Sequence, residues 1–244
     1  MPKNFPSKEG GSPLLAPNNK QQGDFSPGLP EDEFDSLIRR LLSKRKARRV
    51  VTPRGLRARG NFPSLKSHSA HFESLVEEDT WRVAEVSTRV KAFTTHEYVV
   101  SFPRTDREGI QDYTPDGCFR LGGRATLVEV KGDWLIRLAS TRAALQETLR
   151  NARAAGAPLV LIAESDVREP GLQTELKELL RDRPSAGLRR RTIDTELWDP
   201  LEKTKPDAQT LRRWREAQKT CDELLDRVMR RDPDDYIQII AAAH

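Results

Sequence analysis

The chain has 244 residues, of which 36% are hydrophobic and 32% are charged, and its formal net charge is +5. This length suits one or two domains, and the positive excess suits an acidic partner such as nucleic acid. No stretch reaches the roughly 18 apolar residues of a membrane span, and the N-terminus lacks the apolar core of a secretory signal peptide. The two cysteines form neither a disulfide framework nor a metal-ligand pair. We therefore expect a cytoplasmic protein with no membrane partner.

The first part of the chain is predicted to be a tail, a helix and a basic arm. Residues 1–30 are rich in Pro, Gly, Ser and Asn, which is typical of a disordered tail. Residues 31–59 begin with an amphipathic helix, EDEFDSLIRRLL, and continue as an arm. Ten Lys or Arg and no acid lie between Arg39 and Arg59. The arm is either a solvated surface or a contact for DNA phosphates. In the second interpretation, DNA is bound by Arg54, Arg57 and Arg59.

Residues 60–183 carry the pattern of a mixed α/β domain. A helix is predicted in SAHFESLVEEDTWRVAEV, followed by strands in RVKAF, HEYVVSF, QDYTPDGCFRL and ATLVEVKG. Gly122 and Gly123 provide a hairpin turn between the last two strands. Next come a helix in STRAALQETLRNARAAG, a buried strand in PLVLIAE and a helix in PGLQTELKELLRD. This order predicts the α/β class, with a mixed sheet flanked by helices.

Residues 184–244 are predicted to be a helical C-terminal extension. The segment TLRRWREAQKTCDELLDRVMRRD reads as one long, highly charged helix with an interrupted apolar stripe. The stripe either packs on the core or docks to a partner subunit.

Charged residues inside an apolar strand suggest a catalytic site. Glu129 and Lys131 project from one face of the strand ATLVEVKG, because side chains alternate along a strand. Asp116 lies near the start of the preceding strand, so the Gly122–Gly123 turn can bring it beside Glu129. Two neighbouring carboxylates repel each other unless a cation or a proton lies between them. Such an oxygen-rich pocket suits Mg²⁺.

This pocket suits phosphodiester hydrolysis, because a bound metal ion activates water and neutralises charge on phosphate. Lys131 either orients and deprotonates water or stabilises the developing charge. The alternative is a surface salt bridge between Glu129 and a neighbouring cation. The histidines His68, His71 and His96 are scattered, so metal ligation by them is not expected.

Several motifs together resemble the N-terminal catalytic domain of TnsA-type endonucleases. They are GNFPSLK, the helix motif ESLVEED, VKAF, YTPD and VEVKG, within residues 53–135. The resemblance implies a catalytic set of Glu73, Asp116, Glu129 and Lys131, in which the three acids bind the metal. Glu77 shares the helical face of Glu73 and is a rival to it. Lys66 of the first motif either touches DNA phosphate or caps and shields the following helix.

The resemblance further implies a PD-(D/E)xK, restriction-endonuclease-like fold that depends on Mg²⁺ or Mn²⁺. It implies cleavage of the 5′ strands at the ends of a transposable element of double-stranded DNA. The implied partners are an integrase-type transposase subunit (TnsB-like) and an AAA+ ATPase regulator (TnsC-like). The chain departs from the family where TTHEYVV replaces a QP dipeptide, and where Gly117 and Cys118 precede Phe119. A stand-alone restriction or repair nuclease, or a catalytically silent DNA-binding assembly subunit, remain alternatives.

Overall fold

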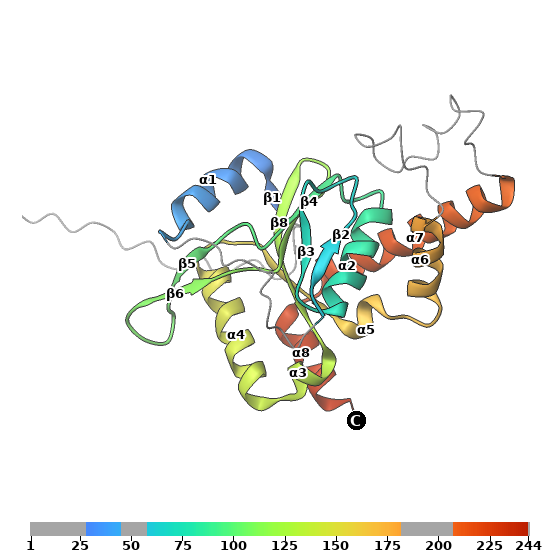
Figure 1. Ribbon diagram of the computed structural model, residues 1–244. Coiled ribbons are helices and arrows are strands. Elements are labelled where there is room, and N and C mark those ends of the chain that lie inside the picture. Colours follow the sequence, from blue (N-terminus) through green and yellow to red (C-terminus); the bar gives the residue numbers. More distant parts are fainter. Residues whose placement is uncertain (1–27, 45–57, 182–206, 244) are drawn as a thin grey trace, which may run out of the picture.

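The computed structural model describes residues 28–44, 58–181 and 207–243. Most of the predicted tail, the arm residues 45–57 and the segment 182–206 lie outside these ranges. The described residues form a mixed α/β structure in which helices flank the sheets (Figure 1). The predicted α/β class is confirmed at this level.

The strands are β1 (Leu29–Pro30), β2 (Gly60–Phe62), β3 (Ala70–Phe72), β4 (Ala92–Thr95), β5 (Val100–Pro103), β6 (Ile110–Tyr113), β7 (Gly117–Arg120), β8 (Arg124–Lys131) and β9 (Leu159–Ala163). The helices are α1 (Glu31–Leu41), α2 (Leu75–Val86), α3 (Asp133–Arg137), α4 (Ala139–Ala154), α5 (Glu164–Val167), α6 (Leu172–Arg181), α7 (Ala208–Arg230) and α8 (Pro233–Ala242).

The central sheet is mixed and has five strands, β1, β4, β7, β8 and β9. β7 and β8 form the predicted antiparallel hairpin. Gly122 and Gly123 turn the chain between them with φ angles of 61° and 86°, which glycine adopts without steric cost. β4 pairs antiparallel with β7, and β9 pairs parallel with β8. The strand β8 therefore has neighbours on both sides.

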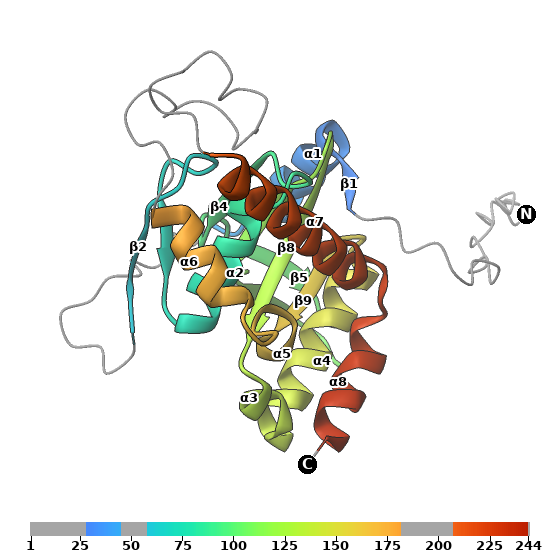
Figure 2. The ribbon, with the colours of Figure 1, turned by 90° about the vertical axis from the view of Figure 1, so that its right-hand side faces the viewer.

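The two faces of β8 belong to two halves of the hydrophobic core. Val128 and Val130 pack in the half that contains residues of α2, α6 and α7. Leu127 packs in the other half, with residues of α1, α4 and α8. Figure 2 shows α7 crossing in front of β8 and β9. Because side chains alternate along a strand, Glu129 and Lys131 share the face of Leu127.

Two small hairpins differ from the predicted elements. QDYTPDGCFRL was expected to be one strand, but it divides into β6, which pairs with β5, and β7 of the central sheet. Pro115 lies between the two parts and lacks the backbone N–H that a continuous ladder needs. The expected helix at Ala70 is instead strand β3, which pairs with β2. Helix α2 begins after Ser74, whose hydroxyl oxygen accepts a hydrogen bond from the Glu77 N–H at 3.2 Å.

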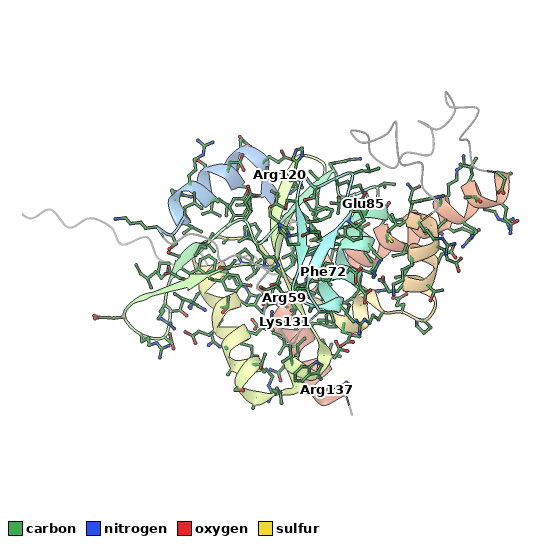
Figure 3. The ribbon with its side chains drawn as sticks, viewed as in Figure 1. Arg59, Phe72, Glu85, Arg120, Lys131 and Arg137 are labelled. Atoms are coloured by element: carbon green, nitrogen blue, oxygen red, sulfur yellow. The ribbon has the colours of Figure 1, made fainter. Side chains whose placement is uncertain are left out.

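The predicted amphipathic helix is α1, and it is tied to β7 by Arg120, which is labelled in Figure 3. The guanidinium of Arg120 lies 2.9 Å from Asp35 and 3.4 Å from Glu31. Phe34 is fully buried on the same helix.

The long C-terminal helix is α7, and its apolar stripe packs on the core. Trp214, Leu225 and Val228 are each 1% exposed. Asp222 accepts hydrogen bonds from the Ser87 hydroxyl at 2.6 Å and from the Thr88 N–H at 2.8 Å. The apolar stripe of α7 therefore packs on the core, which is one of the two interpretations that the sequence allowed. Within the described ranges, no helix combines the length and apolar character needed to cross a membrane.

Candidate active site

The β7–β8 hairpin brings Asp116, Glu129 and Lys131 together. Asp116 directly precedes β7, and Gly117 pairs with Val128, so Asp116 lies across from Glu129. The Nζ atom of Lys131 lies 3.5 Å from Oδ2 of Asp116 and contacts Oε1 of Glu129. The Asp116 Oδ2 also accepts a hydrogen bond from the Val130 N–H at 2.7 Å. The expected proximity of these three side chains is present in the fold.

Glu129 lies in a buried and crowded environment. The residue is 5% exposed, and the Tyr113 hydroxyl donates a hydrogen bond to its second oxygen. Burial, and then the charge of Asp116, raise the pKa of Glu129 above its ordinary value, although Lys131 acts in the opposite direction. Burial lowers the pKa of Lys131, but the negative charges of Glu129 and Asp116 have the larger combined effect, so its pKa is raised. A cation between the two carboxylates would relieve their repulsion.

The carboxylate that α2 contributes to this site is Glu77. It lies in the first turn of α2 and is 6% exposed. The predicted ligand Glu73 precedes the helix, and its Oε1 lies 3.9 Å from the guanidinium of Arg59. The prediction assumed that Glu73 and Glu77 belong to one helix. In the structure, Glu73 lies in the short segment between β3, which ends at Phe72, and α2, which begins at Leu75. The Glu73 N–H instead donates to the Glu77 carboxylate at 2.8 Å.

His96 lies among these side chains, although the scatter of the histidines in the sequence argued against metal ligation by it. It follows β4 and is 6% exposed, and its Nε2 lies 3.2 Å from Oε2 of Glu77. Burial opposes a charge on the imidazole, but the hydrogen bond and charge of Glu77, followed by the charges of Asp116 and Glu73, raise the pKa of His96. The departure from the family pattern at TTHEYVV was the sequence signal that could have drawn attention to it.

Glu77, His96 and Asp116 form a donor set that fits a cation. One ligand atom of each residue lies within 4.8 Å of the others. Ligand atoms about 2.1 Å from an ion lie about 3 to 4 Å from one another, so small side-chain rotations would close the set around an ion. Lys131 connects this set to Glu129, because it lies close to both Asp116 and Glu129. The donors therefore suit a divalent cation next to a fixed positive charge.

Lys66 is buried at the end of α2. The residue is 8% exposed, and its Nζ donates to the carbonyl oxygens of Ala84 at 2.9 Å and Ser87 at 2.5 Å, at the end of α2. Burial lowers the pKa of Lys66 to about 8, although Glu85 raises it. These two hydrogen bonds hold the ammonium group at the end of α2. The structure thus favours the capping role, and a contact of Lys66 with DNA phosphate stays a prediction.

Of the three arginines predicted to bind DNA, the structure describes Arg59. Arg59 has a side chain that is 22% exposed and lies beside Glu73. Figure 3 shows Arg59 and Lys131 in the middle of the view. Arg54 and Arg57 lie outside the described residues. DNA binding by these three residues stays a prediction.

Comparison with models of protein families and with curated proteins finds no match to this chain.

Proposed function

We propose that this chain is a metal-dependent DNA endonuclease of the TnsA type with a restriction-endonuclease-like fold. The observation that carries the proposal is the meeting of Asp116, Glu129 and Lys131 at the end of two paired strands. Glu77 from α2 and the motif combination in residues 53–135 support it. The proposed substrate is double-stranded DNA at transposon ends, cut on the 5′ strands.

The side chains divide the proposed work by their chemistry. Asp116 and Glu77 hold the cation, and Glu129 adds negative charge on the neighbouring strand. When bound, a divalent cation neutralises charge on the phosphate and activates water. Lys131 is a fixed positive charge beside both strand carboxylates, so it can orient the attacking water or stabilise charge on the phosphate. Tyr113 positions Glu129 by its hydrogen bond.

The proposed partners follow from the family resemblance. An integrase-type transposase subunit (TnsB-like) would cut and join the 3′ ends, and an AAA+ ATPase regulator (TnsC-like) would control the assembly. Charge complementarity supports DNA as the substrate, since the formal net charge is +5. The proposal for the ion is Mg²⁺ or Mn²⁺.

The decisive experiment reconstitutes the chain with the products of adjacent genes on DNA that carries element ends. Each strand break is then mapped at nucleotide resolution. We expect 5′-strand cuts that need a divalent ion and that are lost in Asp116→Ala. The matched control is Asp106→Ala, because Asp106 is an exposed acid in the turn between β5 and β6. Equal activity of wild type and Asp116→Ala would reject the proposed site.

The same assay separates the two alternatives. Cutting of DNA by the isolated chain, without partners and without end specificity, would favour a stand-alone nuclease. Absence of cutting by wild type in the complete assembly would favour a catalytically silent subunit.

A further inference from the structure

His96 is held against the site by its backbone as well as by its side chain. Thr95 pairs with Gly117, so His96 lies opposite Asp116, and its N–H donates to the Asp116 carbonyl oxygen at 3.1 Å. Its φ angle is 51°, and no other non-glycine residue in the described ranges has a positive φ. A left-handed backbone conformation outside glycine is uncommon and concentrates at functional sites. The fold therefore holds the backbone of His96 in a sparsely populated conformation, and this backbone places the imidazole beside Asp116 and Glu77.

The imidazole also faces a surplus of negative charge. Glu77 contacts its Nε2 from α2, and Asp116 and Glu73 act on it from the segments before β7 and before α2. Lys131 lies beside Asp116 but pairs mainly with Glu129, which it contacts more closely. A cation among Glu77, His96 and Asp116 would balance the carboxylates and use the imidazole nitrogen as a neutral ligand.

A nitrogen ligand changes which cation the site prefers. Mg²⁺ is a hard ion that takes oxygen ligands and keeps several waters. Imidazole binds more readily to first-row transition ions, whereas carboxylates suit Mg²⁺, Ca²⁺ and Mn²⁺. Of the two ions in the proposed function, Mn²⁺ is the first-row transition ion and accepts an imidazole nitrogen more readily than Mg²⁺ does. His96 lies in TTHEYVV, the segment in which this chain departs from the QP that the resemblance leads one to expect.

We propose that His96 is a direct nitrogen ligand of the catalytic cation and that it makes the site selective for Mn²⁺ over Mg²⁺. This inference deepens the proposed function, since it concerns the ion of the same site. The ligand set is then Asp116, Glu77 and His96, with the remaining positions left for water and a phosphate oxygen. Glu73 is outside the set.

The test uses the full chain with Mn²⁺ and reads the coordination directly. Pulsed electron paramagnetic resonance of bound Mn²⁺ detects the ¹⁴N coupling of a coordinated imidazole. We expect this coupling in wild type and in the control His71→Gln, because His71 bonds to Asn61 on the β2–β3 hairpin. We expect its loss in His96→Gln. Calorimetric titrations should show that the ratio of the Mg²⁺ to the Mn²⁺ dissociation constant falls about tenfold or more in His96→Gln.

A second variant covers the case in which His96→Gln fails to fold. Asparagine tolerates the left-handed conformation, so His96→Asn keeps the backbone and removes the imidazole. Far-UV circular dichroism identifies which variant is folded. Either folded variant should lack the nitrogen coupling.

The outcomes distinguish this inference from the proposed function. If Mn²⁺ binds wild type in an Asp116-dependent way without nitrogen coupling, the inference is overturned, while metal-dependent cleavage can still hold. The inference is also overturned if the ratio of dissociation constants is the same in wild type and His96→Gln. Nitrogen coupling that disappears in His96→Gln supports the inference. If such a protein fails to cut DNA in the complete assembly, the proposed function is rejected and the Mn²⁺ site remains.

Discussion

Tyr113 and Lys131 each engage one oxygen of Glu129, so this carboxylate is held from two sides. The tyrosine ring packs against Phe102 of β5, with ring centroids 6.0 Å apart. The β5–β6 hairpin thereby fixes a side chain of the central sheet. Loss of a hydrogen bond to a buried carboxylate lowers the free energy of unfolding by about 1–3 kcal/mol. It also leaves the position of the carboxylate less well defined.

We predict that Tyr113→Phe lowers the rate of strand cutting about tenfold, because the ring is kept while the hydrogen bond that positions Glu129 is lost. Single-turnover cleavage under the reconstituted conditions measures this rate. Tyr98→Phe is the matched control, since the Tyr98 hydroxyl interacts with Arg120 instead of with the site. A similar loss in both variants would argue against the positioning role.

Glu73 and Glu77 provide a paired test of which carboxylate binds the cation. Glu77→Gln should weaken Mn²⁺ binding by tenfold or more, because it removes a charged ligand while the amide can still take part in the cap at Ser74. Glu73→Gln should change binding by about twofold or less, since Glu73 lies outside the donor set. Calorimetric titration of the folded variants gives both dissociation constants. The opposite order would restore the original prediction of Glu73.

The pair of His96 and Glu77 should make the stability of the metal-free protein depend on pH. The pKa of His96 is higher in the folded protein than in the unfolded chain, where it is about 6.5. Its contribution to the free energy of unfolding is therefore fully present below the pKa of the unfolded chain and is lost as pH rises through the pKa of the folded protein. The comparison is made in buffer that contains a chelator, so that no metal ion is bound. The difference in melting temperature between wild type and His96→Gln should be largest near about pH 5.5 and should decrease toward about pH 9. Thermal unfolding across this range measures it. A difference that grows with pH would contradict the raised pKa.

At the scale of elements, α2 links the candidate site to the rest of the fold at both of its ends. Its first turn delivers Glu77, and its last carbonyl groups accept hydrogen bonds from the buried Lys66. Glu85 is fully buried near the same end and accepts hydrogen bonds from the Ser64 hydroxyl and the Leu65 N–H. The position of α2 therefore depends on the segment 64–66, for which the sequence left open a contact with DNA phosphate or a capping role.

We predict that Lys66→Met lowers the free energy of unfolding by about 2 kcal/mol, because carbonyl groups and Glu85 lose a buried positive partner. Urea denaturation measures this loss. The affinity of the folded variant for DNA and its dependence on salt should not change. Lys91→Met serves as the control for removal of an exposed lysine. A reduced salt dependence in Lys66→Met alone would support the original phosphate contact.

At the scale of the whole molecule, the C-terminal helices complete the core of the segment that carries the site. The residues Trp214 and Leu225 of α7 belong to the same buried cluster as Trp81 of α2 and Val128 of β8. Asp222 of α7 anchors the loop between α2 and β4, the strand that leads to His96. On the other face, Arg137 of α3 donates to the Ile240 carbonyl oxygen of α8 at 3.4 Å.

Trp214→Ala should destabilise the protein by about 3–5 kcal/mol, because it removes a fully packed aromatic side chain from this cluster. The neighbouring exposed residue provides the control Arg215→Ala, which should change stability by about 0.5 kcal/mol or less. Chemical denaturation gives both values. Equal stability of the two variants would mean that α7 does not pack on the core in solution.

The sequence by itself determined the features that rest on local pattern. The alternation in ATLVEVKG and the glycine turn predict β8, its hairpin with β7 and the proximity of Asp116, Glu129 and Lys131. Helical periodicity likewise predicts α4, α6 and α7. In each case, neighbours in sequence are the neighbours in space, so the backbone period and one short turn suffice.

The tertiary structure alone decided the contacts that join distant segments. The pairing of β3 with β2 keeps the residues before Glu73 in a strand, so Glu73 lies before α2 and Glu77 lies in its first turn, although a helical wheel places both on one face. The pairing of β4 with β7 brings His96 to Asp116, and the packing of the chain buries Lys66 at the end of α2. These outcomes depend on strand register and long-range packing, whose free energies no local pattern of residues expresses.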